Sequence, residues 1–370
     1  FGTNYYVMAG PLTRTALVAL STTMKCVERI IPCSDGLKLA AKHWPSQTSA
    51  AGSGDAANKV LCLHGWLDNC ASFDLLAPAL WAKAPGGSAE VLALDFPGHG
   101  LSSHKSPDGP SQLLAEYAFY THEVVQQMGW TNFTIVGHSM GAGVATIYAA
   151  AFPDAVKGMA LLDGAGPLAR KAEDISRHVR AAVERRSKSN KFLYPSLDFV
   201  GSSATGEQGG NGVRVYPSLD SAIETRMNTA KLSPGSQYLS REAAEAMVRR
   251  ATVPVLAAGD DISNGGMEGP VKFRHDPRLQ WPSLQYFTRE QVQQLYRDVQ
   301  CPVCIILAED GWPFDRRSIE DVEQLLQPTS VKKLPGSHHF HADPESAPAV
   351  IEEVVAFFAT HSSTRVVAVE

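Results

Sequence analysis

The sequence has few cysteines, no surplus of positive charge and no long apolar run. Six cysteines in 370 residues are too few for a small scaffold that depends on disulfides. Lys and Arg total 33 against 38 Asp and Glu, a formal net charge of -5, so no general basic surface is available to bind nucleic acid. No apolar run approaches the roughly 18 residues of a transmembrane helix. We therefore expect a soluble protein with no nucleic-acid partner and no transmembrane segment.

Acidic residues are missing from the first 27 positions, where Arg14 and Lys25 are the basic residues and Thr and Ser recur. This composition is typical of the remnant of an organelle transit segment, and equally of an N-terminal extension. We interpret residues 1–26 as such an extension. The sequence favours an intracellular protein, with an organelle as the alternative, and leaves the compartment and the oligomeric state open.

The remaining sequence alternates between strand-like and helix-like segments. With 44% apolar residues the chain can bury a large core, and its length allows about two domains. Short runs rich in Val, Ile and Leu alternate with helical stretches, which is typical of a mostly parallel sheet covered by helices. Asp35-Gly36 predicts an antiparallel hairpin ahead of the parallel strands. The strands are expected at 27–32, 37–44, 60–63, 91–95, 133–136, 156–162, 303–307 and 331–334.

The alternation breaks between Ala165 and Asp298. Residues 170–191 hold eight Lys or Arg and three acids, which indicates a solvated helix face, with the membrane-binding surface of a lipase as the alternative. Two glycine-rich loops and many aromatic residues follow. We interpret residues 165–298 as a helical lid, inserted into an α/β core formed by residues 27–164 and 299–370.

A nucleophile-elbow pattern, GxSxG, occurs at residues 137–141. In this pattern a serine lies on a sharp turn between a strand and a helix, and the glycines permit their close approach. A predicted strand precedes the pattern, and the small residues Ala142 and Gly143 follow it. Ser139 is therefore the predicted nucleophile. It needs a base, because a serine hydroxyl is a weak nucleophile at neutral pH.

The base is expected late in the chain. Three histidines follow the last predicted strand, and we favour His338 over His339 as the base, while His341 is expected to face the lid or the core. A metal at His338 and His341 is the alternative, but no carboxylate or cysteine with ligand spacing accompanies them. Residues 301–304, a CxxC sequence, are interpreted as ordinary strand residues. We expect no metal and no cofactor.

The acid that orients the base should lie between the serine and the histidine in the sequence. We predict Asp310, which follows the strand before the one that carries the histidine. Asp163, at the end of the preceding strand, is its competitor, and Glu309 and Asp315 are further alternatives.

An acyl-transfer site also needs N–H donors for the oxyanion. The Met140 amide follows the nucleophile, and the Trp66 amide lies in the loop after the first parallel strand, so these two are the predicted donors. His64, in the same loop, is expected to fix that loop through hydrogen bonds to the backbone and not to act in catalysis.

Several separate segments resemble the α/β-hydrolase superfamily, specifically its serine hydrolase-like branch. They are LHGWLDNCASFDLLAPAL, LALDFPGHGLSS, VGHSMGAGVA and LPGSHHFH, with RHDPRLQWPS in the lid. The resemblance extends from about Val27 to Phe358. It implies an eight-stranded, mostly parallel sheet with a helical lid after the sixth strand, and it carries Ser139, Asp310 and His338 over as nucleophile, acid and base. The turn AEDG departs from the family's usual GxxD form by one residue.

The predicted function is that of a serine hydrolase that cleaves a small-molecule carboxylic ester or thioester with an apolar acyl or alcohol part, through an acyl-enzyme. Hydrolysis of a carbon–carbon bond uses the same triad and stays open. The alternative from another class is a ligand-binding or regulatory protein that keeps the fold and turns over little.

Overall fold

The structure is a computed structural model, and most of the predicted extension over residues 1–26 lies outside its described part. The described residues are 15, 26–46, 58–83, 89–106, 113–193, 214–255 and 269–361.

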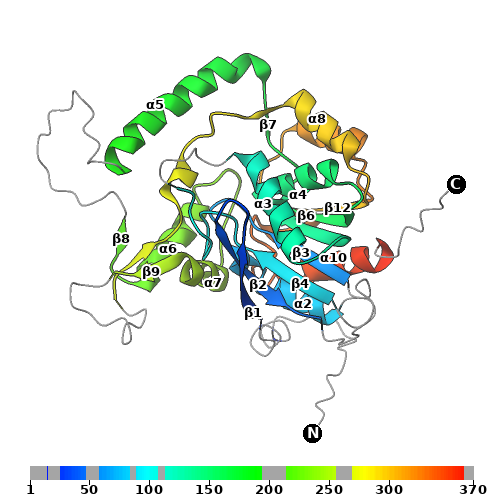
Figure 1. The fold of residues 1–370 in the computed structure, drawn as a ribbon, viewed down its shortest axis with the longest axis horizontal. Coiled ribbons are helices and arrows are strands. Elements are labelled where there is room, and N and C mark those ends of the chain that lie inside the picture. Colours follow the sequence, from blue (N-terminus) through cyan, green and yellow to red (C-terminus); the bar gives the residue numbers. More distant parts are fainter. Residues whose placement is uncertain are drawn as a thin grey trace, which may run out of the picture.

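An eight-stranded sheet forms the centre of the molecule (Figure 1). Along the chain its strands are β1 (Val27–Pro32), β2 (Lys38–Trp44), β3 (Asn58–Leu63), β4 (Ala89–Leu94), β5 (Phe133–His138), β6 (Val156–Leu162), β12 (Val303–Asp310) and β13 (Ser330–Ser337). They lie side by side in the order β1-β2-β4-β3-β5-β6-β12-β13. β1 pairs antiparallel with β2, as does β2 with β4, and every other pairing is parallel. The predicted α/β architecture is confirmed, including the hairpin, whose turn places Gly36 at φ 87°.

Helices cover both faces of the sheet because its strands are apolar on both sides. Leu61 and Leu63 of β3 belong to one buried cluster, while Val60 and Cys62 of the same strand belong to another; such alternation is the two-residue period of a strand. The first face is covered by α3 (Leu114–Gln127), α4 (Met140–Ala151) and α8 (Arg289–Asp298), and the second by α2 (Leu76–Lys83) and α10 (Ala347–His361).

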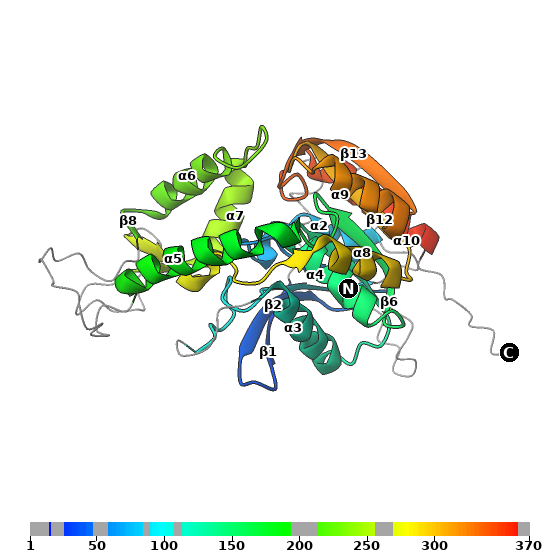
Figure 2. The same cartoon turned by 90° about the horizontal axis from the view of Figure 1, so that it is seen from above.

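The insertion enters the chain after β6, the sixth strand of the sheet, and ends before α8. The predicted lid of residues 165–298 included α8, which packs on the sheet. Its elements are β7 (Ala169–Arg170), η2 (Ala172–Asp174), α5 (Ile175–Leu193), β8 (Val215–Tyr216), α6 (Leu219–Ala230), α7 (Arg241–Ala251), β9 (Thr252–Pro254), β10 (Val271–Phe273), η4 (Pro277–Gln280) and β11 (Phe287–Thr288). β7 and β11 pair in parallel, so the start and the end of the insertion lie together. From the β7–β11 pair, α5 extends away from the sheet (Figure 2). α6 and α7 pack against each other.

Buried charge fastens the insertion to the sheet. Arg250 of α7 donates to Asp95 at the end of β4, at 2.8 Å, and to Glu28 of β1, at 2.7 Å. Asp95 also accepts the amide of Cys70 at 2.7 Å. Charged groups this deeply buried are stable only when paired in this way. Among the helices described, none is long and apolar enough to cross a membrane.

Candidate active site

Ser139 occupies a strained turn between β5 and α4. Its backbone has φ 53° and ψ -114°, a conformation that costs a non-glycine residue free energy and that tends to occur at functional sites. A Cβ on Gly141 would lie 2.0 Å from the carbonyl oxygen of Leu63, and one on Gly137 would lie 2.6 Å from the carbonyl oxygen of Gly141. Only glycine fits at these two positions, which explains why the pattern predicted the turn.

The base reaches Ser139 from the other end of the chain. His338 directly follows β13, and its Nε2 lies 2.9 Å from Ser139 Oγ, so the serine hydroxyl donates to the imidazole. His338 is 9% exposed. The two histidines that the sequence offered as neighbours, His339 and His341, point elsewhere: His339 hydrogen-bonds to Asp68, and His341 is fully buried.

The acid that contacts His338 is Asp163. The Nδ1–H of His338 donates to Asp163 Oδ2 in a short hydrogen bond, and Asp163 is 1% exposed. The predicted acid, Asp310, is exposed at the end of β12, and no hydrogen bond in the described part of the chain joins it to His338. This corrects the prediction: the structure brings Asp163, the competitor at the end of β6, to the place expected for Asp310.

The turn after β12, which was expected to carry the acid, instead forms hydrogen bonds with Asp163. Asp163 accepts the amide of Ala308 at 3.0 Å and the amide of Trp312 at 2.8 Å. Gly311 leaves room for the carboxylate, and Asp163 itself has φ 40°. Two backbone donors and the histidine therefore fix the orientation of this carboxylate.

The residues of the two predicted oxyanion donors, Met140 and Trp66, line the same cavity as Ser139. Met140 is the first residue of α4, and the amide at that position has no acceptor within its helix. Trp66 lies in the loop after β3 and lines the same cavity as Ser139, and its indole Nε1 donates to the carbonyl of Leu279 in the insertion at 2.9 Å. His64 fixes this loop as expected, since its Nδ1 donates to the Gly65 carbonyl and its Nε2 accepts the Phe96 amide.

A buried ionic cluster lies beside the turn that holds Ser139. Asp68 accepts from Arg226 of α6 at 2.7 Å and from His339 Nε2 at 3.0 Å. Burial by itself raises the pKa of the Asp68 carboxyl, but His339 and Arg226 outweigh it and hold that pKa well below its usual range. His138 of the elbow lies beside this cluster, with its Nδ1 3.7 Å from Asp68, and its Nε2 donates to the carbonyl of His338 at 2.8 Å. Sequence reasoning missed Asp68 and Arg226.

Two imidazoles of this region are buried with unused nitrogens. Within the described residues, both ring nitrogens of His341 and Nδ1 of His138 lack a hydrogen-bond partner. The two ring centroids are 4.2 Å apart. Burial lowers the pKa of His341 to about 3, and burial together with His341 and His338 lowers that of His138. Both rings are therefore neutral at physiological pH. Across the described ranges no group of His, Cys, Asp or Glu is arranged to hold a metal ion.

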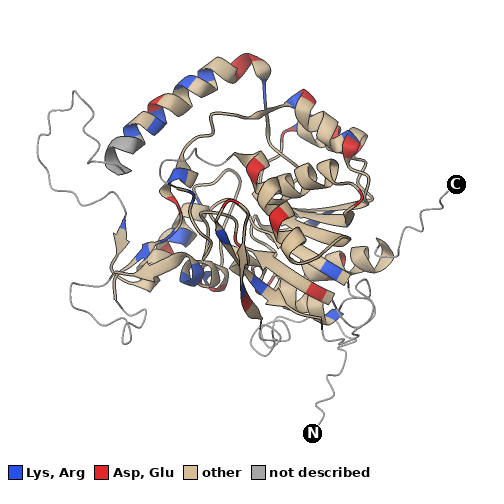
Figure 3. Cartoon of the chain, in the orientation of Figure 1, with Lys and Arg blue, Asp and Glu red and all other residues tan. Residues whose placement is uncertain are grey.

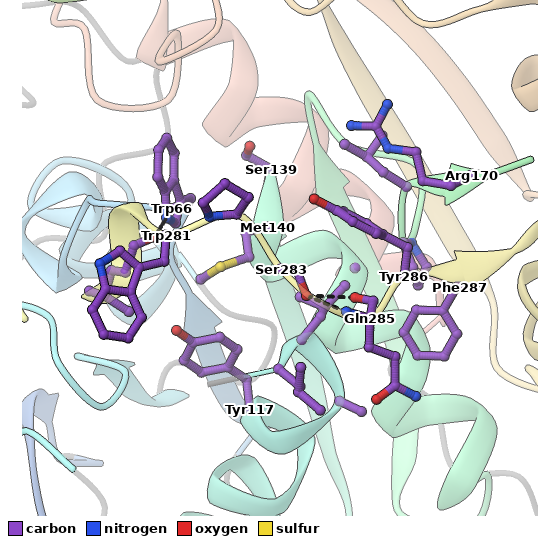
Figure 4. Close-up of a pocket in the computed structure, with 18 of the residues that line it drawn as sticks. Trp66, Tyr117, Ser139, Met140, Arg170, Trp281, Ser283, Gln285, Tyr286 and Phe287 are labelled. Carbon is purple, nitrogen blue, oxygen red and sulfur yellow. Dashed lines mark hydrogen bonds between the residues drawn. The ribbon is translucent and has the colours of Figure 1, made fainter. Parts of the chain in front are cut away.

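A cavity of about 640 Å³ opens above Ser139 between the sheet and the insertion. Figure 4 shows Trp66 and Trp281 on one side of it and Tyr286 and Phe287 on the other. Its remaining apolar lining includes Leu113, Leu114, Tyr117, Met140, Leu168, Leu279, Trp312 and Phe314. The serine therefore faces a largely apolar space that a small organic molecule fits.

Comparisons with known proteins identify the family to which this fold belongs. Residues 58–344 match the family model described as alpha/beta hydrolase fold. A serine hydrolase-like protein of Dictyostelium discoideum is 30% identical over 84% of this chain and 76% of its own length, and human serine hydrolase-like protein 2 is 29% identical over 85% and 89%. The crystal structure of a hypothetical protein from Pseudomonas aeruginosa PAO1 has a TM-score of 0.69 and 32% identity, covering 90% of this chain and 99% of that one.

Proposed function

The chain belongs to the α/β-hydrolase-fold family, in which its curated relatives are named serine hydrolase-like, and on that premise we propose that it is a serine hydrolase of carboxylic esters or thioesters. The proposal rests on one observation: Ser139, His338 and Asp163 form a continuous hydrogen-bonded relay at an apolar cavity. That relay is the arrangement that turns a serine hydroxyl into a nucleophile.

In the first half of the reaction Ser139 attacks the substrate carbonyl. His338 Nε2 accepts the hydroxyl proton as the bond from Oγ to the carbonyl carbon forms. The resulting imidazolium is stabilised by Asp163, whose buried carboxylate lies against Nδ1. His338 then passes the proton to the departing alcohol or thiol, and the acyl group stays on Ser139.

The negative charge of the tetrahedral intermediate is accepted by backbone amides. The Met140 amide at the start of α4 is one proposed donor, and the positive end of that helix adds to it. The Trp66 amide is the other. The indole contact to Leu279 ties the Trp66 loop to the insertion, so the insertion contributes to the geometry of this half of the site.

In the second half a water molecule replaces the leaving group. His338 takes a proton from the water, the hydroxide attacks the acyl carbon, and the bond to Oγ breaks as the proton returns to Ser139. The products are a carboxylic acid and a regenerated serine. The apolar walls of the cavity favour an acyl or alcohol part with a hydrocarbon chain.

A fluorophosphonate probe tests the nucleophile directly. We expect it to label the native protein and to leave Ser139→Ala unlabelled, and turnover of a short-chain aryl ester should be lost in the same variant. Labelling retained in Ser139→Ala would show that another residue is the nucleophile.

The second candidate is a binding protein of the same fold with little turnover. The largely apolar cavity is the feature that favours it, since such a space holds a small organic molecule whether or not a reaction follows. If a broad panel of esters and thioesters gives no turnover while a ligand raises the melting temperature, this second candidate is correct.

A further inference from the structure

A second cavity, of about 610 Å³, adjoins the one at Ser139. The two share part of their walls, because Gly166, Pro167, Leu168, Arg170 and Phe314 line both. The pairing of β7 with β11 places Arg170 beside Thr288 at this junction. The two cavities therefore adjoin at a common wall that includes Arg170.

Charged residues make up a larger share of the lining of the second cavity than of the first, whose charged residues are Lys105, Arg170, Arg185, Arg186, Arg278, Asp163 and Asp276. Its cationic lining residues are Arg170, Lys171, Arg177, Arg289, Arg316 and Arg317, and its carboxylates are Asp174, Asp315 and Asp321. The cations thus outnumber the acids by six to three. Figure 3 shows that Lys and Arg continue along α5, the helix that begins at this cavity.

The three carboxylates are already engaged. Asp174 pairs with Arg177 at 2.7 Å, and Asp321 pairs with Arg289 at 2.6 Å. Asp315 accepts from the amide and the hydroxyl of Ser318 at the start of α9 (Arg316–Asp321). These acids are therefore not available to neutralise the other cations of the cavity.

Arg316 pairs with Glu320, which leaves three cations with a weak partner or none among the described residues. The first is Lys171, which approaches Glu173 only to 3.8 Å with both side chains exposed. The guanidinium of Arg170 lies 5.2 Å from the ring centroid of Tyr286, and Figure 4 shows these two side chains next to each other. Arg170 has no carboxylate partner among the described residues. The same holds for Arg317 in the described part of the chain. Arginine forks of this kind match the oxygens of a phosphate.

We infer that this second cavity binds the phosphate-bearing leaving group of an acyl thioester whose acyl chain occupies the apolar cavity at Ser139. The inference rests on the proposed function. The thiol leaves with the proton from His338 while its phosphates remain on Arg170, Lys171 and Arg317, and water then releases the carboxylic acid. Such a substrate uses both cavities at once, which a simple neutral ester does not.

Two substrates with the same acyl group test the inference: butyryl-coenzyme A, which carries phosphates, and the neutral S-butyryl-N-acetylcysteamine. We expect the native protein to prefer the phosphorylated thioester at least tenfold in kcat/KM, and this preference should weaken with added salt. In the Arg170→Gln, Arg317→Gln double variant the ratio of the two kcat/KM values should fall by tenfold or more, since a hydrogen bond between charged groups is worth at least that factor. The matched control is Lys188→Gln, an exposed residue of α5 that lines neither cavity, and it should keep the ratio.

Calorimetric binding of free coenzyme A separates this inference from the proposed function. Ser139→Ala should bind coenzyme A as the native protein does, and the double variant should lose at least tenfold in affinity. Inorganic pyrophosphate should compete, whereas succinate at equal ionic strength should not. No binding of coenzyme A to the native protein, or equal binding by the double variant, overturns the inference while ester turnover through Ser139 can still stand. Loss of fluorophosphonate specificity for Ser139 overturns the proposed function, whatever coenzyme A does.

Discussion

Gly311 lies so close to Asp163 that a Cβ at this glycine would stand 2.3 Å from the carboxylate oxygen Oδ1. The Asp163 carboxylate, at the end of β6, thus has room because the turn after β12 has a glycine at position 311. Asp163 accepts two backbone amides from the same turn, so both of its carboxylate oxygens are held there.

Gly311→Ala should therefore damage catalysis without removing any proposed catalytic group. The added methyl displaces the Asp163 carboxylate, and a misplacement of about 1 Å in a catalytic group can cost roughly a hundredfold in rate. We expect kcat on an aryl ester to fall by about that factor. Gly269→Ala is the matched control, because a Cβ there meets nothing within 4 Å. Equal kcat values in the two variants would contradict the proposed role of this turn.

Asp163→Asn and Asp310→Asn distinguish the two candidate acids. An amide at position 163 cannot stabilise the imidazolium and favours the wrong tautomer of His338, for which the expected loss in kcat is about 10⁴-fold. Asp310 is exposed, so its amide variant should keep nearly full activity. A large loss in Asp310→Asn with little loss in Asp163→Asn would restore the acid predicted from the sequence.

Arg226→Gln should weaken the attachment of α6 to the loop after β3. The change leaves the buried Asp68 with His339 as its remaining hydrogen-bond donor, and removing one partner of a buried charge is costly. We expect the free energy of unfolding in urea to drop by about 2 kcal/mol. Arg249→Gln, which breaks an exposed pair with Glu245 on α7, should change it by less than about 0.5 kcal/mol. Similar losses in both variants would argue against a structural role for the Asp68 cluster.

Stability should decline as the pH falls below 6.5, and His341 should account for part of the decline. Burial lowers the pKa of His341 to about 3 from an ordinary value of 6.5, so between these values the unfolded chain binds a proton that the folded protein does not. The free energy of unfolding therefore falls as the pH falls, by about 1 kcal/mol per such histidine from pH 6.5 to 5.5. His341→Phe keeps a ring against Phe73 and removes this proton site.

Urea unfolding at pH 7.5, 6.5 and 5.5 measures the effect. The loss between pH 6.5 and 5.5 should be smaller in His341→Phe than in the native protein by about 1 kcal/mol. Parallel curves for the two proteins would mean that His341 takes up its proton in the folded state.

The sequence was most informative where a function depends on residues that are close in the chain. The sharp turn at Ser139 could be predicted because Gly137 and Gly141 are required by the contact of the turn with its neighbours, and both glycines lie within five consecutive positions. The alternating strands predicted the sheet because each strand carries its own apolar pattern.

The sequence did not separate Asp163 from Asp310 as the partner of His338, because the choice depends on the turn after β12. Asp163 and Asp310 both end strands that neighbour each other in the sheet, and both fit the required order along the chain. What separates them is the space at Gly311 and the amides of Ala308 and Trp312. The shortened AEDG turn was the available signal. The pair of Asp68 with Arg226 joins residues 158 positions apart, so no pattern of neighbouring residues predicts it.

The pairing of β7 with β11 has a consequence for how such a protein diversifies. Because the chain leaves and re-enters the sheet layer at one place, loops within the segment between β7 and β11 can change in length at little cost: each doubling of a flexible loop costs only about 0.6 kcal/mol of closure entropy. The strands that Ser139, Asp163 and His338 directly follow lie outside that segment. Changes in its loops can therefore alter the wall of the cavity and leave the proposed catalytic residues in place.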